Sequence, residues 1–173
     1  MPNQEANREV LGRGRSRLEW SVADDGDMRI TLSGVIDERA ELGRLATEVG
    51  DKIGSRRVVL DLIGITRITS AGVREWILFM RGMPKGRYVW DTGAPVMIKQ
   101  ANAIVGFLGG ATITSFLYPF YCPRCEHEQD QRFVVGQEIA KGRTALAPVS
   151  CAKCQSAMEP SEDPTQYLAF LDE

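Results

Sequence analysis

The stretch that decides the fold is Arg57–Met80, RVVLDLIGITRITSAGVREWILFM. From Val58 to Ile65 the stretch is apolar apart from Asp61. Such a run is typical of a central strand that is buried on both faces of a parallel sheet. The last part of the stretch repeats apolar residues at helical spacing: Val73, Trp76, Ile77 and Met80. The stretch therefore predicts a strand, a turn at Thr69-Ser70-Ala71-Gly72, and a helix.

The flanking segments extend this alternation. Residues 17–34 predict a hairpin around the turn cluster at residues 24–27, and Asp37–Ile53 predicts a helix with Asp37 as its N-cap. Further along, we expect a strand at Gly86–Gly93, a helix at Ala94–Leu108 and a strand at Thr112–Tyr121. Strands that alternate with helices indicate an α/β fold with a mixed, mainly parallel sheet and right-handed crossovers.

Composition and charge restrict the classes of function. The chain has 173 residues, 43% of them hydrophobic and 25% charged, and a net charge of −2, which is ordinary for a globular protein without a general attraction to nucleic acid. Residues 1–17 carry a net charge of +2 and no sustained periodicity, so we expect a flexible arm. They do not resemble a signal peptide, so a cytoplasmic location is expected.

One segment is long and apolar enough to suggest a membrane span. No charged residue occurs between Lys99 and Arg124, and Ala101–Tyr121 has the length of a bilayer-spanning helix. It is interrupted by Gly109-Gly110 and Pro119, however. We therefore expect a helix before Gly109 and a strand after Gly110, and no membrane span.

The four cysteines form two identical spacings, Cys122-Pro-Arg-Cys125 and Cys151-Ala-Lys-Cys154, with 25 residues between them. Two such pairs supply four thiolates for a tetrahedral zinc ion, and four protein ligands leave no open position for catalysis. One alternative is two disulfides, which the reducing interior of a cell disfavours. The other is a redox pair, which needs one such motif and not two. The single histidine, His127, is a possible substitute ligand.

The pattern resembles a zinc ribbon over residues 122–160, with strands expected at residues 131–136 and 144–150. Residues 122–173 carry a net charge of −4, which disfavours nucleic-acid binding by the ribbon without removing it as an alternative. In the tail, residues 161–173, Asp163 as N-cap and Pro164 at the first helical position predict a short helix. Its expected apolar side consists of Tyr167, Leu168, Phe170 and Leu171.

Three motifs in order carry a family resemblance. They are Gly34-x-x-Asp37, the apolar strand with Asp61 at its centre, and Thr69-Ser70-Ala71-Gly72 at a helix start. Over residues 18–121 the chain resembles the STAS domain of bacterial anti-sigma factor antagonists. The family has Asp-Ser-Ser/Ala-Gly at the helix start, so the chain departs from it at Thr69.

The resemblance implies a bacterial signalling protein that binds an anti-sigma factor or a kinase-like regulator. In the family, the partner kinase phosphorylates the serine aligned with Ser70, and the phosphate blocks binding; Thr69 is a second candidate acceptor. The implied contact surface includes Asp37, Arg67, Gly72 and Arg74. Without a modification, the domain would serve binding alone, and Ser70 would only cap the helix.

Catalysis is not expected, because the sequence shows no nucleophile–base pair and no glycine-rich phosphate loop after a strand. Two further alternatives stay open at this stage. They are self-association and the sensing of a small ligand that nothing in the sequence identifies.

Overall fold

The computed structural model describes residues 9–13, 15–22, 26–83, 87–140, 142 and 144–172. Its strands are β1 Glu9–Arg13, β2 Ser16–Val22, β3 Met28–Ile36, β4 Val58–Ile68, β5 Tyr88–Thr92, β6 Thr112–Ile113, β7 Ser115–Tyr121, β8 Glu128–Val134 and β9 Glu159–Pro160. Its helices are α1 Leu42–Ile53, α2 Ser70–Gly82, α3 Pro95–Ala103, α4 Pro164–Tyr167 and the 3-10 helix η1 Ala169–Asp172.

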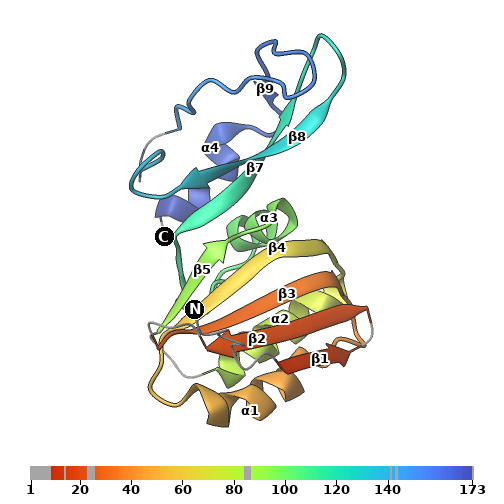
Figure 1. The fold of residues 1–173 in the computed structure, drawn as a ribbon, viewed down its shortest axis with the longest axis vertical. Coiled ribbons are helices and arrows are strands. Elements are labelled where there is room, and N and C mark those ends of the chain that lie inside the picture. Colours follow the sequence, from red (N-terminus) through yellow and green to blue (C-terminus); the bar gives the residue numbers. More distant parts are fainter. Residues whose placement is uncertain are drawn as a thin grey trace, which may run out of the picture.

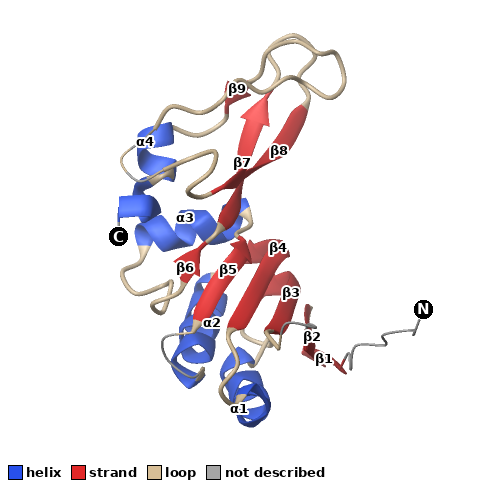
Figure 2. Cartoon of the chain, turned by 60° about the vertical axis from the view of Figure 1, so that its left-hand side comes forward, coloured by secondary structure: helices blue, strands red, loops and turns tan. Residues whose placement is uncertain are grey.

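The first sheet has six strands in the order β1-β2-β3-β4-β5-β6. Figure 1 labels β1 to β5, and Figure 2 also labels β6. The strands β1, β2 and β3 pair antiparallel, whereas β3, β4, β5 and β6 pair parallel. This confirms the expected mixed, mainly parallel α/β sheet with an antiparallel element at its start. The expectation of a flexible arm is wrong for Glu9–Arg13, which pair with β2, and residues 1–8 of that arm lie outside the described part.

The two faces of this sheet differ. Figure 2 shows α1 and α2 on the same side of it, and their apolar residues are buried against Met28, Ile30 and Leu60 of the strands. On the opposite face Asp61 is only half-buried, and Ile63 is 51% exposed. The expectation that β4 is buried on both faces is therefore confirmed for Val58–Leu60 and wrong from Asp61 onward, and β4 does lie centrally between β3 and β5.

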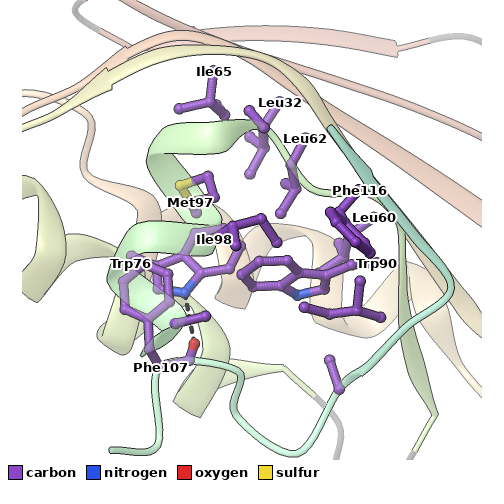
Figure 3. Packing of buried hydrophobic residues seen from close by; sticks show 14 of the residues in the cluster. Leu32, Leu60, Leu62, Ile65, Trp76, Trp90, Met97, Ile98, Phe107 and Phe116 are labelled. Atoms are coloured by element: carbon purple, nitrogen blue, oxygen red, sulfur yellow. Dashed lines mark hydrogen bonds between the residues drawn. The ribbon is translucent and has the colours of Figure 1, made fainter. Parts of the chain in front are cut away.

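Three aromatic rings from different segments meet in the core (Figure 3). Trp76 of α2 stacks on Phe107 with 5.6 Å between ring centroids and meets Trp90 of β5 edge-on at 5.5 Å. The indole N–H of Trp76 donates a 2.8 Å hydrogen bond to the Phe107 carbonyl. A buried donor is thus satisfied, and α2 is fixed to the loop that follows α3.

Two helix boundaries differ from the expectations. The helix α1 begins at Leu42 and not at Asp37, because Asp37 and Ala40 first form a turn closed by the Ala40 N–H and the Asp37 carbonyl at 3.1 Å. The helix α3 ends at Ala103, five residues before the expected end at Leu108. The chain then turns through Gly106, Gly109 and Gly110, all at positive φ, where glycine has no steric penalty.

The segment Thr112–Tyr121 was expected to be one strand of the first sheet, and this is wrong. Only β6 joins that sheet, while β7 forms a second, antiparallel sheet in the order β8-β7-β9. The two sheets meet at Gly93, whose N–H bonds to the Ser115 carbonyl and whose carbonyl accepts from the Leu117 N–H. We call the part from Ser115 to Asp172 the second module. Among the described residues, no helix has both the length and the apolarity needed to cross a bilayer.

In the second module β8 includes the expected strand from residue 131, but residues 144–149 form no strand. The short tail helix is confirmed, with Pro164 at its start and the Asp163 side chain accepting a 3.1 Å bond from the Gln166 N–H. Its apolar residues Tyr167, Leu168 and Phe170 are buried. Phe170 packs edge-on against Phe116 of β7, so the tail belongs to the core of the second module.

Candidate functional site

The four cysteines lie on two loops with the same backbone geometry. In the first loop, between β7 and β8, the Cys122 carbonyl accepts from the Glu126 N–H at 2.9 Å, and the Cys122 N–H donates to the His127 carbonyl at 2.9 Å. In the second, Cys151 makes the equivalent bonds with Gln155 and Ser156, at 2.9 and 2.8 Å. Each loop thus turns its two thiols toward the same side.

The residue after each pair has a left-handed backbone, with φ of 56° at Glu126 and 61° at Gln155. Such a conformation is uncommon for residues other than glycine. It recurs at the same place in both loops, because the tight turn that brings two thiols together requires it. The spacing of the cysteines predicted two metal-binding loops. The residue types at Glu126 and Gln155 did not predict a left-handed backbone at those positions.

The thiols meet at the distances a metal requires. All four Sγ atoms lie within 4.8 Å of one another, and the contacts Cys122–Cys154 and Cys125–Cys151 measure 3.5 and 3.6 Å. Tetrahedral zinc with Zn–S bonds of about 2.3 Å places its sulfurs about 3.8 Å apart. A disulfide needs about 2.05 Å, and the four cysteines are free thiols, so the predicted clustering is confirmed and the disulfide alternative is excluded.

The cluster favours at least one thiolate. The Ser156 side chain and the Ser156 N–H lower the pKa of the Cys154 thiol to about 6, whereas burial and hydrogen bonds from its neighbouring thiols raise the pKa of Cys125 to about 12. Cys154 is therefore the thiol that ionises most readily, and a bound cation would favour ionisation of the neighbouring thiols. The cluster is compatible with a zinc ion held by four thiolates. His127 contributes a backbone carbonyl to the first loop and lies outside the four-residue cluster.

The second candidate site is the corner between β4 and α2, formed by residues 69–72. Thr69, not Ser70, is the N-cap of α2: its Oγ1 accepts a 3.0 Å bond from the Gly72 N–H, so the expectation that Ser70 caps the helix is wrong. The Thr69 N–H in turn donates to the Ile36 carbonyl at 3.0 Å. The corner is thereby tied to the end of β3.

Gly72 explains why the corner lies so close to β3. A Cβ at this position would be 2.0 Å from the Ile36 carbonyl oxygen, so only glycine fits. Asp37 directly follows Ile36; it is 9% exposed, and its carboxylate accepts a 3.0 Å bond from the Arg39 N–H. Gly72 and Asp37 therefore shape the corner and offer little surface of their own.

Within the corner Ser70 and Ala71 are exposed, and the residues Arg67 and Arg74 that flank it are exposed as well. Ser70 is the first residue of α2, where backbone N–H groups have no carbonyl partner within the helix and favour negative charge. Thr69, by contrast, is half-buried and uses its hydroxyl as the cap. The corner thus presents one free hydroxyl position between two arginines.

A residue that the sequence did not single out joins the two modules. The Asn102 side chain of α3 donates to the Tyr167 carbonyl at 2.8 Å and accepts from the Phe170 N–H at 2.7 Å. A lone asparagine in an apolar helix carries no pattern that points to this role. The tail is therefore bound both to β7 and to the first sheet's own helix α3.

No protein-family model, curated protein or solved structure matches this chain.

Proposed function

We propose that this protein is a non-catalytic signalling or adaptor protein that binds a protein partner through a STAS-like first module. A structural zinc ion would hold its ribbon-like second module. The support for the ion is the pair of equivalent cysteine loops and the sulfur distances near those of tetrahedral zinc. With four thiolate ligands the ion has no open position, so it serves folding and not chemistry.

The observation that carries the binding function is the exposed corner with Ser70 between Arg67 and Arg74. The corner is held rigidly by the Thr69 cap and by the close contact of Gly72 with Ile36. A preorganised surface loses little conformational entropy on binding. The two arginines favour a partner with an acidic contact surface, such as an anti-sigma factor or kinase-like regulator.

Phosphorylation of Ser70 would gate this surface. A phosphate there would lie at the N-terminus of α2, which tolerates negative charge, so the modified protein would stay folded. At the same time about two negative charges would enter a contact made for a neutral hydroxyl and would oppose binding. The structure favours Ser70 over Thr69 as the acceptor, because Thr69 would lose its capping bond.

The test is a pull-down from lysate of the source cells with four baits: the unmodified protein, Ser70→Ala, Ser70→Asp and Ser55→Asp. Ser55 is an exposed serine before the start of β4, at the opposite end of that strand, and so controls for added charge. We expect one partner that Ser70→Ala and Ser55→Asp retain and Ser70→Asp loses. If all four baits capture the same proteins, a phosphate-gated corner is wrong.

A double charge reversal, Arg67→Glu with Arg74→Glu, tests the surface independently of phosphorylation. Both side chains are exposed, so the variant should fold normally. We expect it to lose the same partner that Ser70→Asp loses. Retention of that partner would place the contact surface elsewhere on the molecule.

A further inference from the structure

A cavity of about 460 Å³ lies where the two modules meet. From the first module it is lined by the loop after α3 and by β6, including Leu108, Ala111 and Ile113. From the second module it is lined by Val135, at the end of β8, and by Phe170 and Leu171 of η1. We call it the junction cavity. Its volume falls in the range of about 300–1,000 Å³ that small-molecule sites occupy.

The chemistry of the walls selects the occupant. None of the lining residues carries a formal charge, and the chain has no charged residue between Lys99 and Arg124. A charged group in the cavity would lose its hydration without gaining an ionic partner. An uncharged, apolar group would instead gain from the removal of its surface from water. The walls therefore fit a neutral hydrocarbon group.

The loop after α3 reaches the cavity through a turn rich in glycine. Gly106 and Gly110 have φ of 80° and 85°, and a Cβ at either position would meet no atom within 4 Å. Both residues are exposed, and their positive φ lets the chain turn sharply along the cavity wall. Val105, next to Gly106, is 96% exposed and lies outside the cavity lining.

We propose that the junction cavity binds a free small molecule that is uncharged and apolar. The ligand would contact the loop after α3 on one side and η1 on the other. It would therefore favour the arrangement in which the two modules are packed together, by binding only when both walls are present. This proposal does not depend on the partner-binding corner or on phosphorylation.

The experiment uses the full-length, metal-loaded protein and the uncharged fluorescent probe N-phenyl-1-naphthylamine. We expect saturable binding of one probe per chain, displacement by 1-decanol, and at least tenfold weaker displacement by decanoate, whose carboxylate the cavity cannot pair. Absence of saturable binding, or equal displacement by the alcohol and the carboxylate, would overturn the proposal.

Variants locate the bound probe. Thr112→Trp fills the cavity from an exposed position in β6, and Leu171→Glu places a charge in its wall. We expect each to weaken probe binding at least tenfold. The matched control is Ile63→Glu, an equally apolar, exposed position on the first sheet outside the cavity lining, which should leave binding unchanged. If Leu171→Glu fails to fold, Thr112→Trp alone tests whether the probe binds in the junction cavity. Unchanged probe binding by Thr112→Trp would contradict this assignment.

Discussion

Replacing Gly72 with alanine tests whether direct backbone contact holds the corner against β3. The added Cβ would lie 2.0 Å from the Ile36 carbonyl oxygen and 2.6 Å from its carbonyl carbon, whereas ordinary contact begins at 3.4 Å. The start of α2 must therefore retreat by about 1.4 Å, the difference between 3.4 and 2.0 Å. This displacement also weakens the 3.0 Å bond from the Thr69 N–H to the Ile36 carbonyl.

Overpacking of this kind costs about 1–3 kcal/mol, and a lost hydrogen bond costs about 1 kcal/mol. We expect Gly72→Ala to lower the free energy of unfolding by about 3 kcal/mol, which corresponds to a fall in Tm of about 9 °C for a chain of this size. Thermal unfolding followed by circular dichroism measures the shift.

Gly50→Ala is the matched control. Gly50 lies inside α1, and a Cβ there meets no atom within 4 Å. Because alanine is the better helix former, we expect this variant to gain about 0.5–1 kcal/mol. The same substitution should thus lower the free energy of unfolding at Gly72 and raise it at Gly50. Equal Tm values for Gly72→Ala and Gly50→Ala would refute the close contact at the corner.

Four more outcomes are expected. Purified protein should contain one zinc per chain by atomic absorption, and Cys154→Ser should lower this content and make the second module sensitive to protease; full metal binding by the variant would contradict a four-thiolate site. Thr69→Ala should lose about 1 kcal/mol of stability as a lost N-cap, while Ser70→Ala stays within about 0.5 kcal/mol, as measured by urea unfolding. Asn102→Ala should cost about 2 kcal/mol, because it removes two bonds to the tail, and hydrogen exchange in α4 and η1 should rise selectively. Burial, with smaller contributions from neighbouring acids, raises the pKa of Tyr118 from 10.0 to about 12, so the tyrosine ionises at lower pH in the unfolded state. The contribution of Tyr118 to stability is therefore complete below pH 10 and is lost toward pH 12. Absorbance at 295 nm should show this late ionisation.

Local patterns in the sequence were sufficient for the elements with a strong periodic or capping signal. The apolar run before Thr69 predicted β4, and the spacing of Trp76 and Met80 predicted α2. Asp163 followed by Pro164 predicted the tail helix, and the doubled cysteine spacing predicted a cluster that the structure brings together. In each case the signal depends on neighbours within a few residues, so tertiary context had little to override.

Other expectations were wrong where two local conformations suit the same residues about equally well. In these places a contact with a distant part of the chain favours one of them. Asp37 is a good N-cap by type, yet it forms a turn and α1 starts later. Thr69 and Ser70 can both cap a helix, and the bond from Thr69 to Ile36 selects the first. The segment from Thr112 to Tyr121 reads as one strand, but pairing with β5 and with β8 divides it between two sheets.

The sequence by itself determined the class of fold, the four cysteines that cluster and the place of the corner, because hydrophobic period, cysteine spacing and turn chemistry act over short stretches of chain. Only the tertiary structure decided which face of the first sheet stays open, that the tail belongs to the second module's core, and that a neutral cavity lies at the junction. These features depend on residues far apart in the chain: Asn102 bonds to Phe170, and Ile113 and Leu171 line the same cavity. No local pattern in the sequence encodes such pairings.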